Sequence, residues 1–251
     1  MKKSVAVVIL AAGMGTRMKS DKAKVLHEVQ GRPMILYVVE TARKIAGEDV
    51  VVVVGNQAGM VRDTLSQTAA LQYAYQDEQL GTGHAVLCAL PYIPAHCGHV
   101  VILCGDVPLI LPKTIKRLVA EHFDHRRDIS LLAVELENPA GYGRILLDTN
   151  QQVIGIKEEA DATEEQKRIK LINSGIYCVQ KEFLMDSLPK IQSNNAQKEI
   201  YLTDIIAIGY ETQKKMGLMV GNDCQEILGI NTCEDLAVVD AVMQARLRNI
   251  S

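Results

Sequence analysis

The opening of the chain constrains its fold more than any other segment. Residues 5–10 are apolar and mostly β-branched, and two glycines, Gly13 and Gly15, follow closely. An apolar run of this length that ends at glycine is typical of a strand buried on both faces of a parallel sheet. Glycines after such a strand let backbone N–H groups approach an anion, and Arg17 and Lys24 add positive charge. The segment predicts a site for the phosphates of a nucleoside triphosphate; a plain strand-to-helix turn is the alternative.

Two widespread phosphate-binding loops do not fit this segment. The dinucleotide-binding pattern needs a small residue where the chain has Met18, and a helix where residues 19–22 favour a loop. A P-loop needs Gly-Lys-Ser/Thr, but Gly15 is followed by Thr16 and Arg17. The segment therefore belongs to neither class.

Composition excludes several kinds of protein. The chain has 251 residues, of which 48% are hydrophobic and 23% charged, so it can bury a full globular core. A net charge of -3 gives no electrostatic case for nucleic acid. The first apolar run is too short for a signal peptide or a membrane span. Six cysteines lack metal-binding spacing, so we expect free thiols, a cytoplasmic location and no membrane partner.

Apolar runs and helical patterns alternate through the first half of the chain. We expect strands at 5–10, 50–54, 71–75, 100–103 and 129–135, and helices at 34–46, 83–90 and 112–123. This alternation favours α/β architecture with a mostly parallel, doubly wound sheet and right-handed crossovers.

The rhythm changes after about residue 138. We expect strands at 144–147, 153–158, 171–179 and 216–220, helices at 182–188, 203–211 and 234–248, and a charged loop at 161–170. Thr203 is the expected cap of its helix. The pattern predicts a domain over 1–230, whose smaller β subregion shapes a second ligand's pocket, and a C-terminal helical arm over 231–251.

Polar and glycine residues follow the predicted strands. The pair Gly81-Thr82 before a helix allows a ligand to approach the backbone closely, and an ordinary helix entry is the alternative. The Gln76 amide can both donate to and accept from the edge of a nucleotide base. Asp106, after a buried strand, is a good Mg²⁺ position or a turn cap. Asn173 lies in an apolar strand and needs a partner, and Asn231 is either a ligand or a helix cap.

These motifs carry a family resemblance. Residues 10–18, 24–27, 79–84, 105–109, 141–144, 172–175 and 201–206 resemble, in order, those of the sugar-phosphate nucleotidyltransferases. They are most similar to the uridyltransferase half of the bacterial bifunctional N-acetylglucosamine-1-phosphate uridyltransferase/glucosamine-1-phosphate acetyltransferases. The resemblance implies a Rossmann-like fold and the reaction of UTP with N-acetyl-α-D-glucosamine 1-phosphate to give UDP-N-acetylglucosamine and pyrophosphate, with Mg²⁺ as cofactor.

The resemblance also implies roles for the matching residues. Those implied to line the nucleotide pocket are Leu10, Ala11, Ala12, Gly13, Gln76, Gly81, Thr82, Cys104 and Gly105. Those implied to bind the sugar are Gly141, Glu158 and Asn173, with Glu159 as a neighbour that could replace Glu158. Arg17 and Lys24 are implied to act on the phosphates, and Asp106 and Asn231 to hold Mg²⁺, with Asn231 also close to substrate.

The chain also departs from the family pattern. Ala23 replaces the usual proline, Cys104 a frequent tyrosine, and Met14 a lysine present in some members. The hexapeptide repeat of an acetyltransferase half is absent, which leaves the oligomeric state open. Two other functions stay open: a transferase for another nucleotide or sugar phosphate, and a nucleotide-binding subunit without activity.

Overall fold

The computed structural model describes residues 4–55, 57–66 and 71–248. Its centre is a sheet whose strands follow the order β11-β7-β10-β6-β1-β4-β5. Their bounds are β1 Val5–Leu10, β4 Val50–Val54, β5 Gln72–Tyr75, β6 His99–Cys104, β7 Ile129–Glu135, β10 Leu171–Gln180 and β11 Met216–Val220. Neighbouring strands pair in parallel, except that β10 runs antiparallel to both β6 and β7. The mostly parallel α/β sheet is therefore confirmed, with one antiparallel strand inserted.

Helices cover both faces of the sheet, because the side chains of each strand alternate between them. In β1, Val7 and Ile9 pack in the core with α1 (Met34–Ala46), α2 (Ala58–Leu65) and α4 (Pro112–Asp124). Ala6 and Val8 face the other core, with α3 (Thr82–Ala89), α5 (Lys181–Ser187) and α6 (Asp204–Glu211). This is the doubly wound, Rossmann-like arrangement that was predicted.

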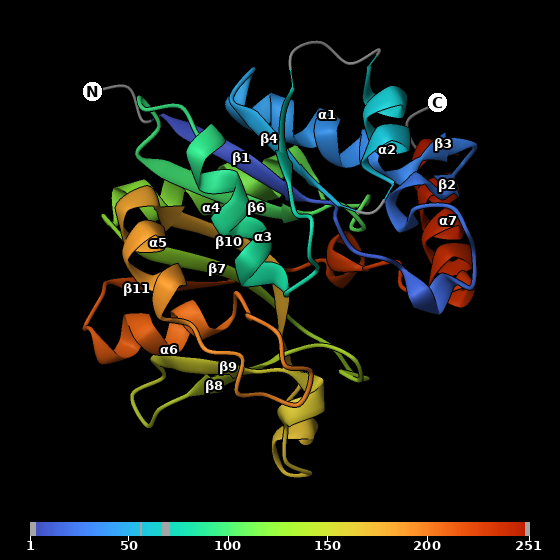
Figure 1. Cartoon of the computed structure of the whole chain (residues 1–251). Helices are drawn as coiled ribbons and strands as arrows, with labels where there is room; N and C mark the ends of the chain where they lie inside the picture. The colour runs from blue at the N-terminus through green and yellow to red at the C-terminus, as the bar shows by residue number, and fades with distance from the viewer. Residues whose placement is uncertain (1–3, 56, 67–70, 249–251) are drawn as a thin grey trace.

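Two hairpins complete the strands, one joined to the main sheet and one forming a separate two-stranded sheet. The hairpin of β8 (Arg144–Leu147) and β9 (Val153–Lys157) pairs with β10. The hairpin of β2 (Glu28–Val29) and β3 (Arg32–Pro33) lies beside α7 (Cys233–Arg248). Figure 1 shows β8–β9 at the bottom of the molecule and α7 at the right.

The last helix packs onto the rest of the chain. Val239 and Met243 of α7 pack in a small apolar cluster that includes Met18 and Met34. The Asp240 carboxylate accepts hydrogen bonds from Gln30 at 2.6 Å. The C-terminal arm therefore makes both apolar and polar contacts with the residues around the first loop.

The predicted strands and helices agree with the structure to within one residue at each end. Two differences between the prediction and the structure remain. The sequence did not predict α2, a short helix in which Val61 and Leu65 are buried. The expected Thr203 cap is wrong: Thr203 has helical dihedrals and no capping side-chain bond, and its hydroxyl donates instead to Glu158.

The charged stretch 161–170 contains only short 3-10 turns, as expected of a loop. All six cysteines are free thiols. Within residues 4–55, 57–66 and 71–248, none of the helices combines the length and apolar character that a bilayer span requires.

Candidate active site

The candidate site forms where parallel strands end at the same edge of the sheet. The residue after each strand hydrogen-bonds to its neighbour: Gly105 N–H donates to Leu10 O at 2.9 Å, and Gln76 N–H to Val54 O at 2.8 Å. These bonds hold the loops after β1, β5 and β6 side by side. Motifs far apart in the sequence therefore converge on one region.

A first cavity, which we call the loop cavity, has a volume of about 460 Å³. Its wall includes the whole glycine loop after β1, the start of α3 and the end of β6. The sequence-predicted residues that line it are Leu10, Ala11, Ala12, Gly13, Lys24, Gln76, Gly81, Thr82, Cys104 and Asp106.

A second cavity, the hairpin cavity, has a volume of about 390 Å³ and lies toward β8 and β9. The predicted residues that line it are Arg17, Cys104, Asp106, Gly141, Glu158, Asn173 and Asn231. Cys104 and Asp106 line both cavities. The two cavities therefore share a wall at the end of β6.

Charged groups gather at this shared wall. The Lys24 ammonium forms an ion pair with the Asp106 carboxylate and donates to the Asn231 side-chain oxygen at 2.8 Å. The Arg17 guanidinium donates to the same Asn231 oxygen at 2.8 Å. Two cations therefore meet at the Asn231 amide, and only one of them, Lys24, is paired with the Asp106 carboxylate.

Local backbone contacts hold Asn231 in this position. Ile230 N–H donates to Asp106 O at 3.0 Å, which joins the two segments directly. The Asp235 carboxylate accepts the N–H groups of Asn231 and Thr232, each at 2.9 Å, and Thr232 Oγ1 accepts Asp235 N–H at 3.1 Å. This reciprocal pair is a capping box. Thr232, and not Asn231, caps α7, which leaves the Asn231 side chain to Lys24 and Arg17.

Two adjacent glutamates have different environments. Glu158 lines the hairpin cavity, and its carboxylate accepts the Thr203 hydroxyl at 3.0 Å. Burial raises the pKa of Glu158 above its usual range, although the Thr203 hydrogen bond acts in the opposite direction. Glu159 instead pairs with the buried Arg144 guanidinium at 2.7 Å and accepts Gly141 N–H at 3.1 Å. Glu158 is therefore the one whose side chain borders the cavity.

The predicted glycines contribute in different ways. Gly81 has a φ of 109°, and a Cβ there would lie 2.6 Å from Ile200 O. Gly105 borders neither cavity; a Cβ there would lie 2.9 Å from Leu10 O, so its small size serves strand packing. The Thr82 hydroxyl accepts Leu202 N–H at 3.0 Å and also ties α3 to the segment before α6.

Two amides and one thiol complete the walls. The Gln76 amide nitrogen donates to Gly81 O at 2.9 Å, which fixes its orientation in the loop cavity. The Asn173 side-chain oxygen accepts Gly175 N–H at 3.1 Å, so this buried amide finds a protein partner. Burial raises the pKa of the Cys104 thiol to about 12, so the thiol stays protonated at neutral pH.

Asp106 and Asn231 suit a divalent metal ion. They offer a carboxylate and an amide oxygen, which are hard ligands of the kind that Mg²⁺ prefers. Both oxygens already face one cation, the Lys24 ammonium. The donor set at the shared wall therefore fits a metal ion that is also bound by phosphate oxygens and water.

Among the lining residues that sequence reasoning missed are two acidic ones. Glu199 lines the loop cavity, and Asp235 lines the hairpin cavity. The Thr232-x-x-Asp235 spacing is a readable capping-box signal. Glu199 stands just before the 201–206 motif and could have been included with it.

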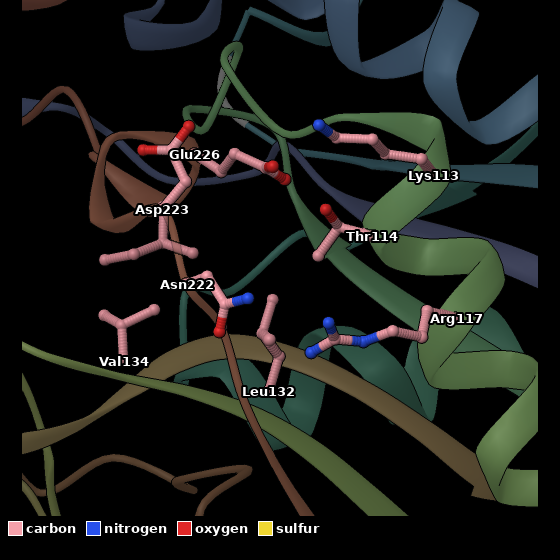
Figure 2. A pocket seen from close by; sticks show the side chains of 10 residues that line it. Lys113, Thr114, Arg117, Leu132, Val134, Asn222, Asp223 and Glu226 are labelled. Carbon is pink, nitrogen blue, oxygen red and sulfur yellow. The ribbon is translucent and has the colours of Figure 1, made fainter.

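A further cavity of about 330 Å³ lies between α4 and residues 221–227. Figure 2 shows Lys113 and Arg117 on α4 opposite Asn222, Asp223 and Glu226, with Leu132 and Val134 as an apolar floor. None of the sequence-predicted site residues lines this cavity. We therefore place the candidate active site at the loop and hairpin cavities.

Comparison with known proteins agrees with this assignment. Residues 7–169 match the model of the MobA-like NTP transferase domain. A Bifunctional protein GlmU of Syntrophotalea carbinolica is 44% identical over 243 residues, which cover 97% of this chain and 52% of that protein. The GlmU protein of Desulfotalea psychrophila is 42% identical over 248 residues, with 98% and 73% coverage. The chain spans about half the length of most of the curated relatives that it matches.

A solved structure shares the fold. A Bacillus anthracis protein, assigned as a glucose-1-phosphate thymidylyltransferase and crystallised with sucrose, superposes with a TM-score of 0.73 at 18% identity, and the match covers 95% of both chains. The family resemblance that the sequence motifs indicated is thus confirmed.

Proposed function

Because the chain belongs to the MobA-like NTP transferase family, we propose that it is a sugar-phosphate uridylyltransferase. Its substrates would be UTP and N-acetyl-α-D-glucosamine 1-phosphate, and its products UDP-N-acetylglucosamine and pyrophosphate. The GlmU relatives, which share more than two fifths of their aligned residues with this chain, support this choice.

One observation carries the proposal. Two cavities meet at Asp106, and Lys24 and Arg17 stand at or beside their common wall. A reaction between two phosphorylated substrates needs adjacent pockets, with positive charge where the phosphates meet. The loop cavity would hold UTP, with Gln76, Gly81 and Thr82 at the uracil. The hairpin cavity would hold the sugar, with Gly141, Glu158 and Asn173 around it.

The reaction requires no general base. A phosphate oxygen of the sugar phosphate attacks the α-phosphorus of UTP, a new P–O bond forms, and the bond to the β-phosphate breaks to release pyrophosphate. The attacking oxygen is already anionic at neutral pH, so the main obstacle is repulsion between two anions. Lys24 and Arg17 would offset this repulsion and stabilise the charge on the α-phosphate and on pyrophosphate. The two cavity walls would hold the reactants in line.

Asp106 and Asn231 would hold the metal ion. Nucleotidyltransferases of this kind generally use a divalent metal, and we propose Mg²⁺ because both ligands are hard oxygen donors. When bound, the ion supplies further positive charge to the phosphate oxygens. The protein's own contribution is to hold the two oxygen ligands together through the Ile230–Asp106 backbone bond.

The proposal includes the organisation and location of the chain. Residues 1–230 would form the catalytic domain and 231–251 a helical arm, whose base carries Asn231 into the site. A cytoplasmic location is supported by the six free thiols, which are typical of a reducing compartment.

A coupled assay of pyrophosphate release tests the function. The purified chain is supplied with UTP and N-acetylglucosamine 1-phosphate, and in parallel with the other nucleoside triphosphates and with glucosamine 1-phosphate or glucose 1-phosphate. We expect the first pair to give the highest kcat/KM. A higher value for another pair would reassign the substrates. The absence of pyrophosphate with every pair would overturn the proposed transferase activity.

A further inference from the structure

A second group of ligand-type side chains lies at the other end of the sheet. Parallel strands that end together also start together, and β1, β4 and β6 are adjacent. Ser4 precedes β1, Asp49 precedes β4, and His96 and Cys97 precede β6. The same parallel pairing that assembles the active site therefore assembles these side chains at the opposite edge.

The donor atoms of Asp49, His96 and Cys97 lie close to one another. His96 Nε2 is 2.8 Å from Asp49 Oδ2, and Cys97 Sγ is 3.5 Å from the same oxygen. All three donor atoms lie within 4.8 Å of one another. Ligands around a tetrahedral zinc ion, with bonds of about 2.0–2.3 Å, stand roughly 3.3–3.6 Å apart. Only a small movement of the His96 ring, whose side chain is 62% exposed, would be needed to match this spacing.

We propose that Asp49, His96 and Cys97 bind a divalent transition metal ion, with Zn²⁺ as the preferred ion. A thiolate and an imidazole are ligands that select zinc over magnesium or calcium. Three protein ligands leave one position, which a water molecule or the Ser4 hydroxyl, 3.4 Å from Cys97 Sγ, would complete. The ion would enter from the exposed His96 side, because the Cys97 side chain is buried.

The charges around the site are compatible with a cation. The Cys97 thiol donates to the Asp49 carboxylate, and burial raises the pKa of the thiol. Metal binding would replace this hydrogen bond and release the thiol proton to solvent. The Lys181 ammonium, held by Ile93 O at 3.0 Å, favours the Cys97 thiolate. The same positive charge opposes a metal ion, and the two negative charges of the Asp49 carboxylate and the Cys97 thiolate would have to outweigh it. Bound metal would join the starts of β4 and β6, which lie on either side of β1, and would stabilise the sheet.

Cobalt substitution tests the site directly. Co²⁺ is titrated into the full-length protein under reducing conditions, and the thiolate-to-cobalt charge-transfer band is followed in the near ultraviolet. We expect the band to saturate at one equivalent, and Zn²⁺ to displace it. The variant Cys97→Ser should lose the band completely. Cys104→Ser is the matched control, because Cys104 lies beside Asp106 at the candidate active site; it should keep the band.

A second variant distinguishes the loss of metal binding from the loss of folding. His96→Gln removes a largely exposed ligand, so the fold should be retained while Co²⁺ affinity falls at least about tenfold, by analogy with the loss of groups that support a metal site. Thermal unfolding gives an independent readout: Zn²⁺ should raise the midpoint of the wild type and not that of Cys97→Ser. A wild type without the band, or a band that survives Cys97→Ser, would overturn the proposal. None of these results depends on transferase activity.

Discussion

The hydrogen bond from Thr203 to Glu158 gives the sharpest test of the hairpin cavity. Both residues are largely buried, and the hydroxyl lies 3.0 Å from the carboxylate. Thr203→Val keeps the shape of the side chain and removes the donor. A hydrogen bond to a charged group contributes about 1.5–3 kcal/mol. If Glu158 binds the sugar as a carboxylate, kcat/KM for the sugar phosphate should fall about 10- to 150-fold.

Steady-state kinetics separate this effect from general damage. The KM for the sugar phosphate should rise and the KM for UTP should stay within about twofold, because the Thr203 hydroxyl contacts Glu158, which lines the hairpin cavity and not the loop cavity. Burial already raises the pKa of Glu158, and removal of the donor should raise it further. The acid limb of the pH profile should therefore move to higher pH, and some activity should return as pH rises. Thr203→Ser retains the hydroxyl and should behave like the wild type. Unchanged sugar-phosphate kinetics in Thr203→Val would refute the role of Glu158.

Other substitutions test the shared wall of the two cavities, the loop cavity and the core. Replacing Arg17 or Asp106 by alanine should lower kcat by about 100-fold or more in the pyrophosphate assay, since each removes one preorganised charged group. The control Asp148→Asn, in the β8–β9 turn, should leave kcat unchanged. Near-normal rates in both alanine variants would exclude these roles. Gly81→Ala places a Cβ 2.6 Å from Ile200 O, at a φ of 109° that residues other than glycine rarely adopt. Its thermal midpoint should fall by about 2–10 °C, from roughly 1–3 kcal/mol of strain, and an unchanged melting curve would contradict this reasoning. Burial lowers the pKa of His122 to about 4, so the folded chain stays unprotonated while the unfolded chain gains a proton below about pH 6.5. Stability should therefore decrease as pH falls from 6.5 to 4, by about 2 kcal/mol between pH 7 and 5, in urea unfolding; an equal decrease in His122→Gln would count against this cause.

Strands and helices were predictable where the apolar residues of a segment follow a single strand or helix pattern. The all-valine β4 and the amphipathic α1, bounded by Pro33 and Gly47, allow only one interpretation. By contrast, α2 is short and contains Gly59, so its intrinsic helix signal is weak and the burial of Val61 and Leu65 decides its structure. The antiparallel direction of β10 was not predictable either, because a buried strand has the same apolar pattern in both directions.

The sequence predicted most residues of the candidate site but not the hydrogen bonds between them. The loops after β1, β5 and β6 had to meet, because parallel strands end at one edge. The pairing of Asn231 with Lys24 depends on a backbone bond between Ile230 and Asp106, 124 residues apart in the chain, and no local pattern encodes it. In the same way, the Thr203 hydroxyl has a suitable partner at its own helix start, yet tertiary packing directs it to Glu158. Local capping preference is a weak signal when a partly buried carboxylate lies within reach of the hydroxyl.

The charge arrangement at the shared wall explains why removing Asp106 should not simply improve phosphate binding. Lys24 and Arg17 are held by Asp106 and Asn231, so their positions are fixed before substrate arrives. Without Asp106, the Lys24 ammonium would lose its ion-pair partner and its flexible stem would regain several rotamers, each of which must be given up again on binding. Preorganised charge contributes to the transition state because no reorganisation is needed at the moment of reaction. In the proposed reaction the Asp106 carboxylate would therefore act twice, as a metal ligand and as the group that positions Lys24.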